Sequence, residues 1–238
     1  MFLDKYIIYF FIFSFIGWIW ETIYCTITSK EWANRGFLFG IICPIYGVGA
    51  ILCIIVRDVL LKAFPDSFNW QYMFLICFFG SIVLEYFTAW VLEKIFHAYW
   101  WDYSHLPLNI KGRVSLFTSL FFGIVGVVIS FVLYPYFRDL ISNIPDIIIE
   151  IIGLIFVILF TSDLTLTISA LTDFDKQVSE FDNAINEHMS ELVESIHRRT
   201  SALYKSAITR VQGFRYPKAN PIKLEKIQKL IQKIKLSK

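Results

Sequence analysis

Charged side chains are scarce in this sequence, and their scarcity excludes an ordinary soluble domain. Only 18% of the 238 residues are Asp, Glu, Lys or Arg, whereas 56% are hydrophobic. Soluble domains carry about 25% charged residues. Apolar runs long enough to cross a hydrocarbon core of ~30 Å, which takes roughly 20 residues, recur throughout residues 1–171. The composition therefore predicts an integral membrane protein in contact with the lipid bilayer.

Several motifs of catalysis and cofactor binding are missing. The sequence has no Gly-x-x-x-x-Gly-Lys-[Ser/Thr] phosphate loop, no His-Glu-x-x-His and no Gly-x-Ser-x-Gly, so ATP hydrolysis, zinc proteolysis and serine hydrolysis lack their usual residues. The four cysteines lie in apolar runs without a Cys-x-x-Cys pair, which indicates buried thiols. The loop from His97 to His105 matches no zinc spacing. We expect no cofactor, no metal and no nucleic-acid partner.

Five apolar runs are long enough to span the membrane. They lie at Tyr6–Ile27, Gly36–Leu61, Tyr72–Phe96, Val114–Phe137 and Ile147–Leu171. No small-residue cleavage site follows the first run, so we expect it to remain as a permanent helix. Only helices satisfy their own backbone polar groups in lipid, and the runs lack the alternation of a membrane barrel. The predicted fold class is all-α: a polytopic membrane helix bundle over residues 1–171 and a helical tail over residues 172–238.

The charge balance differs between these two parts. From Thr172 onward, 13 Lys and Arg accompany 8 Asp and Glu, whereas residues 1–171 hold 9 against 12. Cytoplasmic segments of membrane proteins carry an excess of Lys and Arg. We therefore expect the tail in the cytoplasm and, with five spans, the N-terminus outside. The loops alone favour this orientation by only five basic residues to four.

The tail is predicted to form two helices. An apolar stripe with the spacing of an amphipathic or coiled-coil helix continues from the fifth span as a stalk; it consists of Phe174, Val178, Phe181, Ile185, Leu192 and Ile196. A second helix, rich in lysine, is expected to start with Asn220 as its N-cap and Pro221 at its first position. It suits an anionic membrane surface or an acidic cytoplasmic partner, or else it packs on the stalk. The stripe also makes a homodimer plausible.

Two hairpins of the bundle resemble each other. Each contains a glycine, a glutamate four or five residues later, and then Asn, Arg and Gly at the return. These residues are Gly17, Glu21, Asn34, Arg35 and Gly36 in the first hairpin, and Gly80, Glu85, Asn109, Gly112 and Arg113 in the second. A parallel repeat of residues 1–62 and 72–138, with the fifth span added, would explain the likeness. A chance match is the alternative.

Three carboxylates, Glu21, Glu85 and Asp163, lie within the apolar runs. A charged side chain at the bilayer centre costs about 2.5 to 3.5 kcal/mol on insertion scales, so each is a candidate site residue. Arg35 and Arg113 lie at the inner ends of the second and fourth spans, where each can reach toward a glutamate of its hairpin. The functional hypothesis is a polar site that binds an anion through Arg or moves a proton through Glu. The structural alternative is a buried ion pair that fixes the hairpin packing.

Polar residues at the returns of the hairpins complete the predicted substrate-binding set. Asn34 precedes the second span, and Asp102 and Asn109 precede the fourth. Asp102 has a simpler alternative, because turn carboxylates often tie a loop to its own backbone.

Glycine and proline within the spans predict close contacts and one irregularity. Small residues that allow helices to approach closely are Gly17, Gly80, Gly123 and Gly126. Gly47 and Gly49 follow Pro44 in the second span, so that helix is expected to bend or break there. Broken helices often line substrate sites in transporters, although a packing kink is the commoner explanation.

Several motifs occur in an order that points to one family. They are Ser14-Phe15-Ile16-Gly17-Trp18-Ile19-Trp20-Glu21, Asn34-Arg35-Gly36-Phe37-Leu38-Phe39-Gly40, Cys43-Pro44-Ile45-Tyr46-Gly47, Trp101-Asp102-Tyr103-Ser104 and Asn109-Ile110-Lys111-Gly112-Arg113. Together they resemble the bacterial family Putative ABC-transporter type IV (CmpB-like), over residues 7–140. The resemblance implies a multi-pass protein of the bacterial plasma membrane. ABC-type transport would need a separate ATPase, because this chain has no nucleotide-binding domain.

Three functions remain open from the sequence. A transporter or permease subunit is favoured by the intramembrane charges and the repeat. A membrane-anchored sensor, scaffold or partner-regulating protein is favoured by the tail. An intramembrane enzyme acting on lipid head groups would use Arg35 and Arg113 on phosphate, with a carboxylate or His105 as general base. Because the sequence has no recognisable nucleophile or metal motif, we place the enzyme last.

Overall fold

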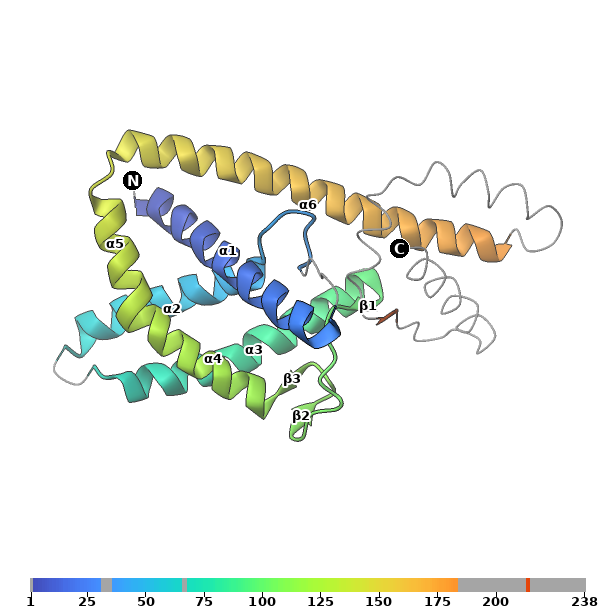
Figure 1. Ribbon diagram of the computed structural model, residues 1–238, viewed down its shortest axis with the longest axis horizontal. Helices are drawn as coiled ribbons and strands as arrows, with labels where there is room; N and C mark the ends of the chain where they lie inside the picture. Colours follow the sequence, from blue (N-terminus) through green and yellow to red (C-terminus); the bar gives the residue numbers. More distant parts are fainter. Residues whose placement is uncertain (1, 31–35, 66–67, 184–212, 215–238) are drawn as a thin grey trace.

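The computed structural model describes residues 2–30, 36–65, 68–183 and 213–214. In these ranges, five helices are long and apolar enough to cross a membrane, which confirms the predicted number of spans. Figure 1 shows a helical bundle in which α6 runs along one side and extends beyond the other helices. The chain is therefore an all-α membrane protein.

Four of the five spans are single helices and one changes its geometry midway. The single helices are α1 (Phe2–Ser29), α2 (Pro44–Ala63), α3 (Trp70–Phe96) and α6 (Asp146–Asn183). The remaining span consists of α4 (Leu116–Val128), a π-helical turn η1 (Ile129–Leu133) and α5 (Tyr134–Ser142). Two antiparallel strand pairs join β1 (Ala98–Tyr99) to β4 (Gly213–Phe214) and β2 (Asn109–Ile110) to β3 (Val114–Ser115).

Polar caps determine where two of the spans begin. The side chain of Asn69 accepts a hydrogen bond from the backbone N–H of Tyr72 at 3.2 Å, in the first turn of α3. At the start of α4, Ser115 and Thr118 form a capping box, in which each side chain bonds to the backbone N–H of the other. Such caps satisfy the N–H groups that the first helical turn leaves without partners.

The second span begins later than the sequence predicted. Residues 36–43 are not helical, and α2 starts at Pro44 instead of Gly36. A proline disfavours the helical conformation in the preceding residue, and Cys43 is accordingly extended, with a φ of −120° and a ψ of 94°. The expected break at Gly47 and Gly49 is wrong, because α2 runs through both as one helix. The irregularity lies before Pro44, where Cys43 donates its N–H to the Ser14 carbonyl at 3.0 Å.

The helices pack as two pairs, α1 with α2 and α3 with α4. Close approach at glycine explains the pairing: a Cβ added to Gly17 would meet Tyr46, and one added to Gly123 or Gly126 would meet side chains of α3. The prediction of close contact is confirmed at these three glycines. It is wrong at Gly80, where no atom lies within 4 Å of an added Cβ.

A half-buried arginine satisfies the backbone where the fourth span changes geometry. In η1 the N–H of Tyr134 bonds to the Ile129 carbonyl, and Pro135 has no N–H to donate. The Ser130 carbonyl would usually accept from the N–H four or five residues later, at Tyr134 or Pro135. Neither N–H is available to it. The Nε of Arg57 donates to this carbonyl at 2.8 Å and so fastens α2 to η1.

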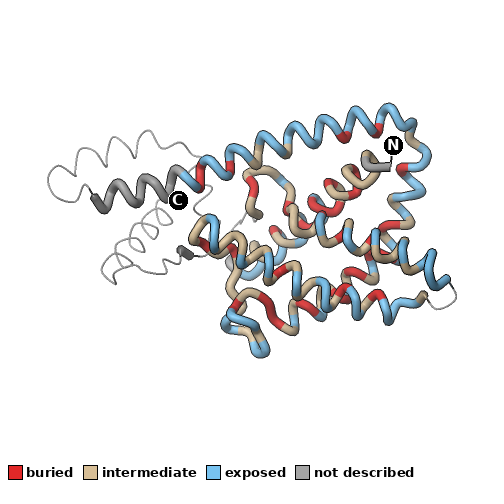
Figure 2. The backbone as a smooth tube through the Cα atoms, turned by 180° about the vertical axis from the view of Figure 1, so that it is seen from behind, coloured by how far each residue is buried: buried red, intermediate tan, exposed pale blue. Residues whose placement is uncertain are grey.

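The longest helix, α6, is exposed over most of its surface. Figure 2 shows this exposure, and many of its large apolar side chains, Leu154 and Leu159 among them, are more than half exposed. A helix that faces lipid on several sides has this pattern. The helix continues beyond the predicted fifth span as far as Asn183, so the tail begins as its extension. The rest of the predicted stalk and the basic terminal helix lie outside the described residues.

Candidate functional site

A cavity of about 460 Å³ lies where the two helix pairs meet. Its wall is formed by α2, α3, α4 and η1, by Glu21 of α1, by the segment before α2, and by the loop after α3. Ligand pockets typically measure about 300 to 1,000 Å³. The cavity therefore has room for a small molecule.

Glu21 places one carboxylate on this wall. Its Oε2 accepts a hydrogen bond from the hydroxyl of Tyr46 on α2 at 2.8 Å. Its Oε1 is 3.7 Å from the Sγ of Cys25, one turn later on α1. Tyr46 occupies this position because Gly17 leaves room for its ring against α1. The contact between helices α1 and α2 thus positions the first carboxylate.

Glu85 places a second carboxylate on the same wall. It is only 5% exposed, and its oxygens accept hydrogen bonds from the Tyr103 hydroxyl at 3.4 Å and the Thr118 hydroxyl at 3.3 Å. Burial and the negative charges of Glu85 and Glu21 raise the pKa of the Tyr103 phenol above its ordinary value. Tyr103 therefore stays a neutral hydrogen-bond donor at physiological pH.

The tyrosine partners of the two glutamates were missed in the sequence analysis. Tyr46 lies in the Cys-Pro-Ile-Tyr-Gly motif and Tyr103 in the Trp-Asp-Tyr-Ser motif. Both motifs were noted only for their resemblance to a family. A carboxylate away from water needs hydrogen-bond donors. The tyrosines within these two motifs could therefore have been identified as candidate donors to the glutamates.

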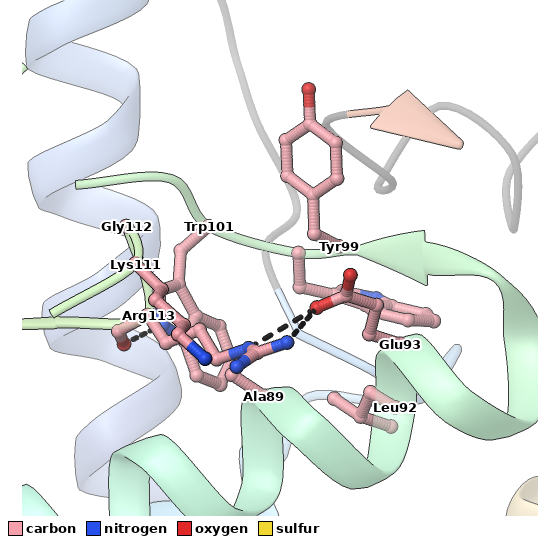
Figure 3. A pocket seen from close by; sticks show the side chains of 9 residues that line it. Ala89, Leu92, Glu93, Tyr99, Trp101, Lys111, Gly112 and Arg113 are labelled. Atoms are coloured by element: carbon pink, nitrogen blue, oxygen red, sulfur yellow. Dashed lines mark hydrogen bonds and ion pairs between the residues drawn. The ribbon is translucent and has the colours of Figure 1, made fainter. Parts of the chain in front are cut away.

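Arg113 does not reach Glu85. Its Nε and Nη2 donate to the Oε2 of Glu93, at 3.1 and 2.7 Å, and its Nη1 donates to the Tyr86 hydroxyl at 2.9 Å. Figure 3 shows the guanidinium directed at Glu93 beside a small pocket, whose volume of about 10 Å³ admits no more than a water molecule. The hydrogen bonds to Glu93 raise the pKa of Arg113 above the ordinary value of an arginine. Glu93 lies two helical turns after Glu85, on the same side of α3 and nearer the loop. This spacing could have identified Glu93 in the sequence as an alternative partner of Arg113.

Asp102 and Asn109 organise the loop between α3 and α4. The Oδ1 of Asp102 accepts hydrogen bonds from the N–H of Ser104 at 2.9 Å and from its hydroxyl at 2.5 Å. Asn109 donates to the Leu106 carbonyl at 2.7 Å and accepts from the N–H of Gly112 at 3.0 Å. Gly112 has a φ of +69°, and an added Cβ would lie against Asp102. These contacts agree with the loop-tying alternative for Asp102.

Asp163 holds the non-helical segment that precedes α2. Its Oδ1 accepts a hydrogen bond from the N–H of Phe39 at 3.0 Å, and its Oδ2 accepts one from the N–H of Gly40 at 2.8 Å. The hydroxyl of Thr167, one turn later on α6, lies 3.4 Å from Oδ1. Non-helical backbone at membrane depth needs such partners, because lipid offers none. The carboxylate of Asp163 supplies them.

The eight predicted site residues thus fall into separate groups. Of those that the structure describes, Glu21 and Glu85 line the cavity, whereas Arg113, Asp102, Asn109 and Asp163 make the contacts given above and are not on its wall. Asn34 and Arg35 lie outside the described residues. A role for these six in substrate binding stays a prediction, and the proposal below depends on the two glutamates.

Two thiols on the cavity wall offer a test of its geometry. The Sγ atoms of Cys53 on α2 and Cys77 on α3 are 3.2 Å apart, and both residues are thiols that form no disulfide. We expect copper phenanthroline, a mild oxidant, to take two electrons and two protons from this pair and join α2 to α3 by a disulfide. Intact mass spectrometry would show the loss of two hydrogen atoms, and Cys53→Ser should abolish the loss. An unchanged mass in the wild-type protein would contradict the packing of α2 on α3.

Comparison with known proteins identifies the family. Residues 8–168 match the family described as Putative ABC-transporter type IV. The match reaches beyond residues 7–140, where the resemblance was noted, and includes most of the fifth span. Searches of curated proteins and of solved structures gave no match. Since the match spans more than half of the chain and the five apolar helices fit a membrane protein, the chain belongs to the Putative ABC-transporter type IV family of membrane proteins.

Proposed function

We propose that the protein is a transport or permease subunit whose solute binds in the cavity between the two helix pairs. The observation that carries this proposal is the presence of two carboxylates, the buried Glu85 and the half-buried Glu21, on the wall of one cavity of about 460 Å³. Ionisable residues within membrane spans commonly mark solute or proton pathways. The family description agrees with transport.

The arrangement of the helices supports the same proposal. The cavity has one wall from α2 and another from α3 and α4, and the paired helices α1–α2 and α3–α4 hold together through their glycine contacts. Many transporters change access by moving one such unit against another around a fixed site. Under this proposal, the two hairpins tilt relative to each other and expose the glutamates to alternate sides of the membrane.

The cellular setting is part of the proposal. The protein resides in the bacterial plasma membrane with its N-terminus outside and its basic tail in the cytoplasm. ATP-driven transport requires a separate ATPase, because the sequence contains no phosphate loop, and the cytoplasmic tail is the segment proposed to bind it. A homodimer through the stalk is the proposed assembly.

The enzyme hypothesis has less support than transport. It assigns lipid phosphate to Arg35 and Arg113; Arg35 lies outside the described residues, and the guanidinium of Arg113 is already engaged by Glu93 and Tyr86. The sensor or scaffold hypothesis depends on the tail, of which residues 184–212 and 215–238 lie outside the described part. The sensor or scaffold hypothesis does not make use of the cavity.

Filling the cavity tests the proposed function. Gly80 lines the cavity and has free space around an added Cβ, so Gly80→Phe should place a phenyl ring where the solute binds. We expect the native mass spectrum of the wild-type protein to show a discrete co-purifying solute that Gly80→Phe loses. The matched control is Val83→Phe, on the same helix at a residue that is 69% exposed. A solute kept by Gly80→Phe, or lost equally from both variants, would contradict the proposed site.

A further inference from the structure

The charged groups on the cavity wall have one sign. Among the lining residues that the structure describes, Glu21 and Glu85 are the only ones that carry a formal charge, and Arg113 points away into its own cluster. Among the described residues, the hydrogen-bond partners of the two carboxylates include the hydroxyl groups of Tyr46, Tyr103 and Thr118 and the thiol of Cys25. The wall therefore presents two acidic groups that no described cation neutralises.

Within the described part of the chain, this pair of carboxylates lacks a positive partner at membrane depth. Burying a carboxylate without a cationic partner is unfavourable, because hydroxyl donors stabilise the charge less than an opposite charge does. A carboxylate in this setting either takes up a proton or binds a positive ligand. The two outcomes exclude each other at one carboxylate, so a proton and a cationic ligand compete.

The remainder of the wall selects the shape and polarity of the ligand. Aromatic side chains from four elements of the chain line it: Phe37, Tyr46, Trp100, Trp101, Tyr103 and Phe122. Aromatic faces attract cations, most strongly when water is excluded. The indole N–H of Trp100 is buried and has no acceptor among the described residues. An inorganic cation would leave this large apolar surface unused.

We infer that the cavity binds a lipophilic organic cation between Glu21 and Glu85, and that this cation exchanges with a proton on Glu85. This inference deepens the proposed function, on which it rests for the placement of the solute in the cavity. It differs from the anion that Arg35 and Arg113 were expected to bind, because the ligand has the opposite charge. A quaternary or protonated amine with apolar substituents has the required chemistry.

The direction of the pH effect follows from the competition. Lowering the pH protonates the carboxyl group of Glu85, removes its charge and weakens cation binding, whereas raising the pH strengthens it. The other titratable groups near the two glutamates include the phenols of Tyr46 and Tyr103 and the thiols of Cys25 and Cys43. Free phenols and thiols lose their protons only above about pH 8, so Glu85 governs the pH dependence of binding below that pH.

Tetraphenylphosphonium is a suitable probe because tetraphenylborate has the same shape and the opposite charge. We would measure equilibrium binding of both ions to the purified full-length protein at pH 5 and pH 7.5. The variants are Glu21→Gln and Glu85→Gln. Glu150→Gln serves as the control, because it removes the same charge from an exposed position of α6 away from the cavity. Gly80→Phe provides a block of the cavity that leaves both carboxyl groups in place.

The expected result is charge-selective and pH-dependent binding. Wild type and Glu150→Gln should bind tetraphenylphosphonium alike. Glu85→Gln should weaken the affinity about tenfold or more, Glu21→Gln should weaken it in the same direction, and Gly80→Phe should abolish it. The binding of tetraphenylborate should not depend on pH, on the two glutamates or on Gly80→Phe in this way. Equal binding of the two ions, or phosphonium binding that survives both Glu→Gln changes and Gly80→Phe, would overturn the inference.

The two proposals fail in different ways. If another solute co-purifies with the wild-type protein and is lost from Gly80→Phe, while tetraphenylphosphonium does not bind, the proposed site stands and the organic cation is wrong. If tetraphenylphosphonium binds as expected but is not moved across proteoliposome membranes by the protein with any driving ion gradient or ATPase, the cation site stands and the transport function is wrong.

Discussion

Asp163→Ala should lower the free energy of unfolding by roughly 3 kcal/mol or more, since each hydrogen bond to a charged group contributes about 1.5 to 3 kcal/mol. The carboxylate accepts from the N–H groups of Phe39 and Gly40. Without it, two amides of a non-helical segment would have no partner in surroundings that offer little water. We expect the loss in an equilibrium unfolding titration of the detergent-solubilised protein, followed by tryptophan fluorescence.

Two controls separate this effect from a general loss of charge. Asp163→Asn keeps one oxygen acceptor and should fall between Asp163→Ala and wild type. Asp146→Ala removes a carboxylate from the first turn of the same helix, where it forms an exposed ion pair with Lys5 at 3.5 Å. Such surface pairs contribute about 0 to 1 kcal/mol. Equal stability of Asp163→Ala and Asp146→Ala would show that the segment before α2 does not depend on α6.

Gly47→Ala should be the second most damaging single change, although it adds only a methyl group. A Cβ at Gly47 would meet the Ser14 hydroxyl and lie 2.6 Å from the Phe10 carbonyl oxygen. The carbonyl belongs to the backbone of α1 and cannot rotate away, so the two helices must separate. Overpacking of this kind costs about 1 to 3 kcal/mol, and we expect a loss in that range in the same unfolding titration.

Gly80→Ala is the matched control for Gly47→Ala. Both changes add one methyl group within a membrane-spanning helix, but no atom lies within 4 Å of the Cβ at Gly80. Alanine is favoured over glycine in a helix by about 1 kcal/mol, so Gly80→Ala should be neutral or slightly stabilising. A similar loss from both changes would mean that helix propensity or lipid contact, and not the contact between α1 and α2, determines the response.

The sequence was sufficient for the spans because their signal is local. Each span is a long apolar run, and the cost of polar groups in lipid leaves a helix as its structure. The start of α2 was not predictable in the same way. Residues from Gly36 onward are as apolar as the helix that follows, and the Phe39 and Gly40 amides are satisfied by Asp163, which lies more than 120 residues later. Apolarity alone does not distinguish a helix from a segment held by a distant carboxylate.

The candidate site was predictable in part for a similar reason. Glu21 and Glu85 were singled out because a carboxylate in an apolar run is costly wherever it points. Their partners come from other elements: Tyr46 lies 25 residues from Glu21, and Tyr103 lies 18 residues from Glu85. The choice of Glu93 over Glu85 by Arg113 depends on how the loop after α3 folds back. Contacts between elements require the packing, which one sequence does not display.

The likeness between the two hairpins remains a prediction of the sequence. Both helix pairs place a glutamate of the earlier helix on the cavity wall, and in both a tyrosine hydroxyl binds that glutamate. The tyrosines differ in position, because Tyr46 lies within α2 and Tyr103 lies in the loop before α4. A duplicated ancestor would have to account for that difference.

The hydrogen bonds between residues 36–43 and α6 connect the lining of the cavity to a helix that extends well beyond it. Gly36, Phe37 and Cys43 belong to the cavity lining. Asp163 binds the backbone between Phe37 and Cys43, and its helix, α6, continues without a break to Asn183. Rotating a helix by one residue turns each side chain by about 100°, which would swing the carboxylate away from both amides. A rotation of α6 about its axis, applied at its C-terminal end, would therefore displace the segment of residues 36–43 that lines part of the cavity.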